Sequence, residues 1–334
     1  MILITGGSGS GKSFYAETET MRIAGNGARY YFAAMRPYGE EALKRIQRHR
    51  LLRSEKGFIT CETYTGIDLF AHRILPQKAV VLLECVPNLL ANEMFDESFR
   101  ALPVAEAVSR VITEICETDK MAEQLLVITN DIFSDGVQYE PATEHYVKAL
   151  LQINMALADH AEQVVEVQSG IPVVLKGKKI NRKITEEAEK REAVELYIGG
   201  RGQGKLDCVL SRHPELSIRD VYNCTEEMNF GGYPYPVLYR LQELFRIQSR
   251  IQDTSSAYEH LTRNILNYLE QNPKTIVIAD EVGSGVIPAE PSEIHFREAS
   301  GRALCRIAKQ ASCVTRLVCG IPQQLKGYSD ETNR

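Results

Sequence analysis

A glycine-rich loop at the start of the chain constrains the fold more than any other feature. Residues 6–13 read GGSGSGKS, which fits the phosphate-binding pattern G-x-x-x-x-G-K-[ST]. A short apolar run at residues 2–4 precedes the loop, and a helical segment extends from residue 14 to about residue 25. The pattern requires this strand–loop–helix context. The sequence therefore predicts a nucleotide-binding P-loop rather than a glycine-rich turn that matches by chance.

Every residue type in this loop has a chemical role. Glycines allow tight backbone turns, so successive N–H groups can point at one anion, and the following helix adds the positive end of its dipole. We expect Lys12 to act in catalysis by reaching the β- and γ-phosphates of a nucleoside triphosphate, and the Ser13 hydroxyl to join the shell of a Mg²⁺ ion. The predicted phosphate-binding residues are Gly6, Gly7, Ser8, Gly9, Ser10, Gly11, Lys12 and Ser13.

Beyond the loop, apolar runs alternate with amphipathic segments. The run at residues 79–85 is continuously apolar up to Glu84, which is typical of a parallel strand covered on both faces. Strands alternating with helices predict an α/β fold of the P-loop NTPase type (RecA-like), with a mainly parallel sheet flanked by helices. The predicted strands are residues 2–4, 30–34, 58–62, 79–85, 125–130 and 164–168, the last of the sheet, and the predicted helices are residues 14–25, 39–53, 67–75, 102–120 and 141–161.

The later part of the chain repeats the earlier part. GGRGQGK at residues 199–205 repeats the P-loop at an offset of 193 residues. Towards the end the offset is 150, so that CGIP at residues 319–322 repeats SGIP at residues 169–172. Matches at fixed spacing predict a tandem duplication. The predicted domains are a first copy at residues 1–177, a charged connector at 178–194 and a shortened, degenerate second copy of the same fold at 195–328.

The two copies have diverged. Because the offset falls from 193 to 150, the second copy lacks about 43 residues after its loop. It has no equivalent of residues 45–49 and no clear equivalent of the LLEC strand. Leu206 stands at the position of Ser13, and a leucine side chain cannot coordinate Mg²⁺. The second copy keeps DEVGSGVIP at residues 280–288, a segment that has become NDIFSDGV at residues 130–137 of the first copy.

Composition and charge narrow the class of protein. The net charge is −5 and charged residues make up 25% of the chain, so we expect no nucleic-acid or membrane partner. No apolar run approaches the length of a membrane span, and the P-loop interrupts the N-terminal apolar run too early for a signal peptide. The eight cysteines form no C-x-x-C pair, which favours reduced structural thiols in a cytoplasmic protein.

Several motifs together resemble one enzyme family. In the first copy they are ITGGSGSGKS, RIQRH at residues 45–49, LLEC at 82–85 and SGIP; in the second copy they are GGRGQGK, DEVGSGVIP, FREASGR at 296–302 and VCGIP. The first copy resembles the bifunctional adenosylcobinamide kinase/adenosylcobinamide-phosphate guanylyltransferase of cobalamin biosynthesis. The resemblance implies phosphorylation of adenosylcobinamide and transfer of GMP from GTP to adenosylcobinamide phosphate. It also implies GTP, ATP and Mg²⁺ as ligands and a homo-oligomer.

The resemblance assigns roles to individual residues as well. His49, at the end of RIQRH, would accept GMP as a phosphoramidate, a role that suits a neutral imidazole near neutral pH. Glu62 and Glu84 would contact guanine and ribose, since a carboxylate can accept both N1–H and N2–H₂ of guanine. The alternatives are an exposed helical histidine and two solvated carboxylates at strand ends. The other implied nucleotide contacts are Ala33, Ala34, Met35, Arg50, Leu51, Leu52 and Arg53.

Three functions stay open on the sequence alone. The first is the kinase and guanylyltransferase activity of the family, located in the first copy. The second is another P-loop small-molecule kinase in which His49 is incidental. The third is a non-catalytic nucleotide-binding protein, which Leu206 and the altered segment at residues 130–141 favour. For the second copy, our hypothesis is that it supplies a loop or an interface to the first, so that changing Asp280 and Glu281 together reduces activity. The alternative is a purely structural role.

Overall fold

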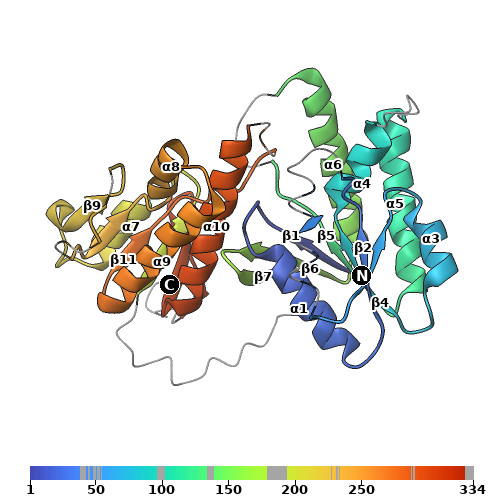
Figure 1. The fold of residues 1–334 in the computed structure, drawn as a ribbon, viewed down its shortest axis with the longest axis horizontal. Helices are drawn as coiled ribbons and strands as arrows, with labels where there is room; N and C mark the ends of the chain where they lie inside the picture. Colours follow the sequence, from blue (N-terminus) through green and yellow to red (C-terminus); the bar gives the residue numbers. More distant parts are fainter. Residues whose placement is uncertain are drawn as a thin grey trace.

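The computed structural model of the chain contains two β-sheets, one in each half of the sequence. It describes residues 1–37, 43, 46, 47, 50, 53, 55–95, 102–133, 139–178, 194–226, 228–230, 232, 234–286, 288 and 290–327. Figure 1 shows the halves as two neighbouring lobes, with helix α10 (Pro291–Gln310) on the side of the second lobe nearer to the first. Both sheets are mainly parallel and carry helices, which confirms the predicted α/β fold.

The first sheet has seven strands in the order β3-β2-β4-β5-β1-β6-β7. Its neighbouring strands are parallel except for β6 and β7, which pair antiparallel. The apolar run predicted as a covered parallel strand is β4, where Leu82 and Leu83 are fully buried. The strands are β1 (Ile2–Thr5), β2 (Arg29–Ala33), β3 (Ile59–Glu62), β4 (Val80–Glu84), β5 (Gln124–Ile128), β6 (Gln163–Gln168) and β7 (Ile171–Lys176).

The prediction that residues 164–168 form the last strand of this sheet is wrong, because β7 follows immediately. Ser169 and Gly170 have φ values of 47° and 80°. Positive φ at both central residues is the geometry of a two-residue type I′ turn, which reverses the chain into a hairpin. Cys319 and Gly320, with φ values of 51° and 80°, form the same connection in the second half.

Helices cover both faces of the first sheet. Helix α1 packs against one face, where Ala16 joins the cluster that contains Ile4 and Leu82, and helices α3, α4, α5 and α6 pack against the opposite face. Helix α4 was not predicted; its short apolar segment follows β4 after one residue, and Pro87 occupies the first turn, where a proline is tolerated. The helices are α1 (Lys12–Ala24), α3 (Ile67–Ile74), α4 (Val86–Met94), α5 (Val104–Met121) and α6 (Pro141–His160).

The second sheet has six strands, in the order β9-β10-β11-β8-β12-β13 when read from its parallel edge. Within the described residues, this order follows β2-β4-β5-β1-β6-β7 of the first sheet, without a strand at the place of β3. The elements are β8 (Glu195–Gly199), α7 (Lys205–Arg212), a 3₁₀ turn (Ile218–Asp220), β9 (Val221–Asn223), β10 (Val237–Tyr239), α8 (Gln242–Ile251), α9 (Ser255–Gln271), β11 (Ile276–Ile278), α10, β12 (Cys313–Val318) and β13 (Ile321–Lys326).

Strand β10 corrects the expectation that the second copy has no clear equivalent of the LLEC strand. It occupies the position of β4, between β9 and β11, and Val237 and Leu238 are fully buried. The strand has only three residues and Pro236 directly precedes it, so the sequence offers too short an apolar run to be recognised.

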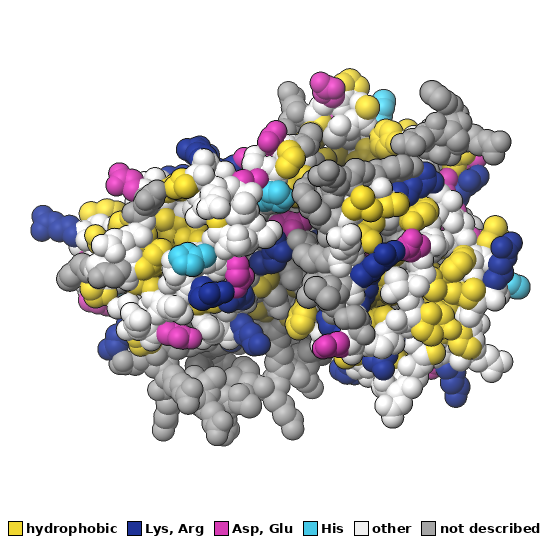
Figure 2. All heavy atoms as spheres, in the orientation of Figure 1, with side chains coloured by type: hydrophobic (Ala, Val, Ile, Leu, Met, Phe, Trp, Pro, Cys, Tyr) yellow, Lys and Arg dark blue, Asp and Glu magenta, His cyan; other side chains and the backbone are white. Residues whose placement is uncertain are grey.

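The described surface carries charges of both signs. In Figure 2 basic and acidic side chains are interspersed over the visible face, in keeping with the small net charge. None of the helices within the described ranges combines the length and the apolar character needed to cross a membrane. All eight cysteines belong to the described residues, and none of them is in a disulfide.

Candidate nucleotide-binding site

The backbone of the first P-loop makes the tight turns that its glycines were expected to allow. It connects β1 to α1, and Gly11, the residue before the helix, has a φ of 87°. A side chain at Gly11 would also be crowded, because its Cβ would lie 3.1 Å from the Cα of Gly170. The Nζ of Lys12 donates to the carbonyl oxygen of Gly7 at 3.0 Å, so the lysine folds back over its own loop. This places its positive charge where the loop would hold phosphate groups.

Ser13, Glu84 and Tyr31 form a connected polar group beside the loop. The Ser13 hydroxyl donates to one carboxylate oxygen of Glu84 at 2.6 Å, and the Tyr31 hydroxyl donates to the other. Burial, reinforced by the negative charge of Glu84, raises the pKa of Tyr31 well above 10, so Tyr31 remains a donor at neutral pH. Glu84 ends β4, and β5 separates this strand from β1, so the order of the sheet brings the carboxylate to the loop.

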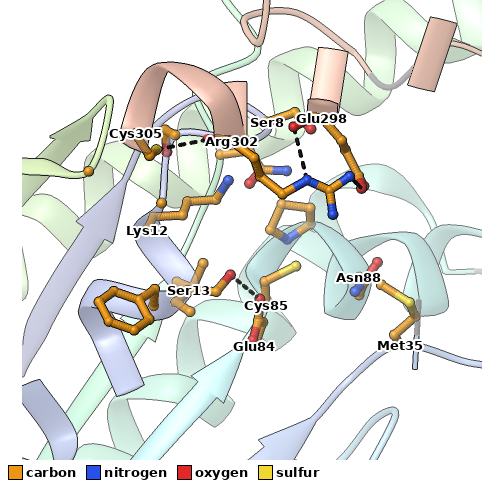
Figure 3. Close-up of a pocket in the computed structure, with 18 of the residues that line it drawn as sticks. Ser8, Lys12, Ser13, Met35, Glu84, Cys85, Asn88, Glu298, Arg302 and Cys305 are labelled. Carbon is orange, nitrogen blue, oxygen red and sulfur yellow. Dashed lines mark hydrogen bonds and ion pairs between the residues drawn. The ribbon is translucent and has the colours of Figure 1, made fainter. Parts of the chain in front are cut away.

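A cavity of about 950 Å³ opens beside this group. Figure 3 shows Lys12, Ser13, Glu84, Cys85 and Asn88 on its first-half side and Arg302 reaching over it from the second half. Such a volume is ample for a nucleotide. The charged residues from the second half that line the cavity are Glu298, Arg302, Arg306, Lys309 and Lys326.

Two buried polar groups lining the cavity lack hydrogen-bond partners among the described residues. They are the Oγ of Ser10 and the Nε and Nη1 of Arg53. Arg53 is only 5% exposed, and its guanidinium carbon lies 3.5 Å from the centre of the Tyr31 ring. Buried donors of this kind are rarely left unsatisfied in folded proteins. Their positions therefore fit a polar or anionic ligand in the cavity.

The residues implied as nucleotide contacts fall into three groups. Ala33, Met35, Arg50, Arg53, Glu62 and Glu84 line the cavity together with residues 8–13 of the P-loop. Ala34 instead packs into the core on the other face of the sheet, and Gly6 and Gly7 shape the loop without lining this cavity. His49, Leu51 and Leu52 lie outside the described residues. Of the predicted helix at 39–53 the structure describes Leu43, Ile46, Gln47, Arg50 and Arg53, all helical.

The first P-loop is in direct contact with the second half of the chain. The backbone N–H of Ser8 donates to the carbonyl oxygen of Gly283 at 2.8 Å. Gly9 lies so close to α10 that a Cβ on Gly301 would be 2.9 Å from its backbone, and the thiol of Cys305 donates to the Gly9 carbonyl oxygen at 3.4 Å. Sequence reasoning did not identify these α10 residues as part of the site. The retained FREASGR motif was the signal that could have indicated them.

The second P-loop has a different environment. Lys205 is almost fully buried, and its Nζ lies 2.7 Å from a carboxylate oxygen of Asp280 and 2.6 Å from the carbonyl oxygen of Gly200. Asp280 also accepts from Gln242 at 2.9 Å. The lysine charge is therefore neutralised inside the protein, and Leu206 packs into the apolar core of the second half.

Comparison with known proteins identifies the family. The model of the cobinamide kinase / cobinamide phosphate guanyltransferase family matches residues 2–175 and 241–325, which is well over half of the chain. The chain belongs to this family. The resemblance seen in the motifs is thereby confirmed, and the matched residues lie in both halves.

Two relatives within the family are bifunctional adenosylcobalamin biosynthesis proteins. The one from Escherichia coli (strain K12) is 29% identical over 184 residues, which cover 53% of this chain and 99% of the relative. The one from Salmonella typhimurium (strain LT2) is 28% identical over 185 residues, with the same coverage of both chains. A solved structure of an ATPase domain shares 7% sequence identity with this chain, with a TM-score of 0.33. The alignment covers 53% of this chain and 76% of the ATPase-domain chain.

Proposed function

We propose that this member of the cobinamide kinase / cobinamide phosphate guanyltransferase family phosphorylates adenosylcobinamide and then transfers GMP from GTP to the product. The observation that carries the proposal is the complete P-loop, with Lys12, Ser13 and Glu84 around one cavity, in a chain of this family. The substrates would be adenosylcobinamide, adenosylcobinamide phosphate, GTP and ATP, and the working form a homo-oligomer.

In the kinase step, the P-loop would bind and orient the triphosphate. The loop amides and Lys12 would neutralise charge that builds up on the transferred phosphoryl group, which is the main catalytic contribution in this class of reaction. Ser13 and Glu84 would hold Mg²⁺. A bound Mg²⁺ ion would neutralise negative charge on the phosphate groups. The hydrogen bond between Ser13 and Glu84 at 2.6 Å supports this role for Glu84 rather than the contact with guanine or ribose implied by the resemblance.

In the guanylyl step, His49 would carry the GMP. A nitrogen of His49 attacks the α-phosphorus of GTP, forming a P–N bond and breaking the bond to the β-phosphate oxygen, and pyrophosphate leaves. A phosphate oxygen of adenosylcobinamide phosphate then attacks the same phosphorus and the P–N bond breaks, yielding adenosyl-GDP-cobinamide and free His49. Ile46 and Arg53, three residues before and four residues after His49, both line the cavity, which supports this assignment.

Glu62 is our candidate for guanine recognition. It lines the cavity from the carboxyl end of β3, its side chain is 41% exposed, and it pairs with Arg50. A carboxylate can accept the N1–H and N2–H₂ groups of guanine together, and adenine offers no such pair. Glu62 would therefore favour GTP over ATP in the guanylyl step.

The proposal is tested with GTP labelled at the α-phosphate. We expect the wild-type protein to become covalently labelled, His49→Ala to remain unlabelled, and His145→Ala, which changes an exposed histidine of α6, to label normally. Addition of adenosylcobinamide phosphate should discharge the label. Failure of the wild-type protein to label, or equal labelling of His49→Ala, would leave another P-loop kinase or a non-catalytic nucleotide-binding protein as the function.

A further inference from the structure

Helix α10 of the second half forms one wall of the nucleotide cavity in the first half. Its residues Gly301 and Cys305 touch the backbone of Gly9 in the first P-loop. The DEVGSGV loop is tied to the same place, because Arg297 of α10 donates to the carbonyl oxygen of Ser284 at 3.0 Å and the neighbouring Gly283 accepts from the P-loop. The wall is therefore anchored to the P-loop at two consecutive residues, Ser8 and Gly9.

This wall carries positive charge towards the cavity. Arg302, Arg306 and Lys309 follow each other at helical spacing on α10, and all three line the cavity. Arg306 also forms an ion pair with Glu259 of α9 at 2.7 Å. Arg302 is held by Glu298 of its own helix, through the carbonyl oxygen at 3.1 Å and the carboxylate at 3.3 Å, and Figure 3 shows it extending over the cavity.

Helix α6 of the first half provides an internal comparison. It starts 150 residues before α10 and has the same length, so each position has a counterpart. Gln152, Ala156 and Asp159 stand where α10 has the three cations, so the positive charge is absent from α6. Its residues Leu151 and Met155, at the positions of Gly301 and Cys305, are 42% and 64% exposed.

The two halves have thus kept complementary parts. The first half has the intact P-loop and no cations at these positions of α6, whereas the second half has the cations on α10 and a P-loop closed by its own aspartate. Leu151 would also prevent the close backbone approach that Gly301 allows. The cations are retained on α10, the helix that faces the working loop.

We propose that Arg302 is a phosphate-binding residue for the nucleotide on the first P-loop, so that one composite site is built from both halves of the chain. This inference rests on the proposed function, because it requires a nucleoside triphosphate on the loop. A guanidinium presents paired N–H donors to phosphate oxygens and keeps its charge at all physiological pH values. Arg302 would approach the phosphate chain from the second-half wall of the cavity, and Glu298 would orient it as a positioning residue.

The test is the affinity for a fluorescent GTP analogue in the presence of Mg²⁺. We expect Arg302→Ala to raise the Kd by about tenfold to hundredfold, as for loss of a hydrogen bond to a charged group, and Arg302→Lys to raise it less. Arg302→Ala should also weaken the dependence of the Kd on salt, which a structural role would not change. The matched control is Arg263→Ala, an exposed arginine of α9 that does not line the cavity.

The outcomes separate this inference from the function on which it rests. If the wild-type protein does not bind the analogue, or Lys12→Ala binds it normally, the proposed function fails and the inference fails with it. If the wild-type protein binds, Lys12→Ala does not, and both Arg302 variants match Arg263→Ala, then only the role of Arg302 is overturned. The unfolding midpoint measured without nucleotide shows whether the variants are folded. If Arg302→Ala does not fold, the affinity of Arg302→Lys provides the result.

Discussion

The two P-loops of this chain share a backbone but differ in what surrounds the lysine. Lys12 extends over a loop that faces a cavity, with Asn130 on the cavity wall. Lys205 is paired with Asp280, the residue at the position of Asn130 after an offset of 150 residues. A carboxylate in place of an amide at this position therefore accompanies the buried ion pair of Lys205 in the second half. A P-loop motif by itself does not show that the lysine is available for phosphate.

The residue that follows the lysine is polar in the first P-loop and apolar in the second. Ser13 donates to Glu84, which ends a five-residue strand, whereas Leu206 packs into the core and the corresponding strand, β10, has three residues. In the second half, packing of Leu206 and the ion pair of Lys205 thus stand where the first half has polar groups beside a cavity. We interpret the second half as a support for the site in the first.

The largest effect should come from removing the two lysines separately. We expect Lys12→Ala to reduce turnover by about 100- to 1000-fold, because a charge aimed at the phosphoryl group is lost. Lys205→Ala should leave turnover close to that of the wild type, because its ion pair serves the fold. Leaving Asp280 without its cation should cost about 1–3 kcal/mol in the free energy of unfolding. Steady-state kinetics and urea unfolding of both variants provide the measurement. A large loss of turnover in folded Lys205→Ala would break the comparison.

The next effect concerns the two carboxylates that line the cavity. Glu84→Gln should reduce turnover by about 10- to 100-fold and raise the Mg²⁺ concentration needed, because the amide lacks the negative charge with which a carboxylate attracts the cation. Glu62→Gln, the matched control, should mainly change the preference for GTP over ATP in the guanylyl step. Kinase assays at a series of Mg²⁺ concentrations distinguish the two. An unchanged Mg²⁺ requirement in Glu84→Gln would argue against its role at the metal.

A third effect tests the interface that holds the halves together. Arg316 of β12 lies 3.1 Å from Glu166 of β6 in the first half and 3.3 Å from Glu281 in the second. Replacing it with methionine leaves two partly buried carboxylates without this cation, so Arg316→Met should cost about 3 kcal/mol in the free energy of unfolding. It should also weaken nucleotide binding, because the wall formed by α10 would be displaced. Arg263→Met is the control, and equal stability of the two variants would show that this contact does not hold the halves together.

The smallest expected effect concerns how the free energy of unfolding of the first half depends on pH. Burial raises the pKa of Glu114 in α5 to about 7, and the counterpart of Glu114 in α9 is the neutral Asn264. Because the native state binds this proton more tightly than the unfolded state, wild-type stability should fall as the pH rises from about 4.5 to 7. Glu114→Gln should remove this slope and be more stable at pH 8 by on the order of 1–2 kcal/mol.

Urea unfolding between pH 5 and pH 8 provides that measurement. The control is Glu117→Gln, which changes a half-exposed carboxylate on the same helix that pairs with Lys120 and should retain the wild-type slope. A slope in Glu114→Gln equal to that of the wild type would show that another group is responsible.

The sequence was sufficient for those parts of the fold that depend on local pattern. The P-loop, the covered strand β4 and helix α5 were predicted because their signals lie within a few consecutive residues. Strand β7 was not predicted, because the SGIP segment suggests a turn that closes the sheet. The positive φ values of Ser169 and Gly170 instead make this turn reverse the chain into another strand. Ala34 was expected in the site, but successive residues of an extended segment face opposite sides, so only Ala33 and Met35 reach the cavity.

The non-local part of the site could not be predicted in this way. The contact of Glu84 with Ser13 depends on strand order, since β4 and β1 are two places apart in the sheet. The contribution of Arg302 depends on how the second half docks on the first, through Gly301 and Cys305 against Gly9. The divergence of the copies led to the hypothesis that the second copy supplies a loop or an interface to the first, but it did not indicate which of its residues line the cavity.

The central claim is that the chain has one working phosphate loop, completed by the second half. It is tested most directly by calorimetric titration of the wild-type protein with α,β-methylene GTP, which cannot transfer its GMP, in the presence of Mg²⁺. We predict one bound nucleotide per chain, abolished in Lys12→Ala and retained in Lys205→Ala. Two bound nucleotides per chain, with one lost in each lysine variant, would show that the second loop also binds phosphate and would contradict this account.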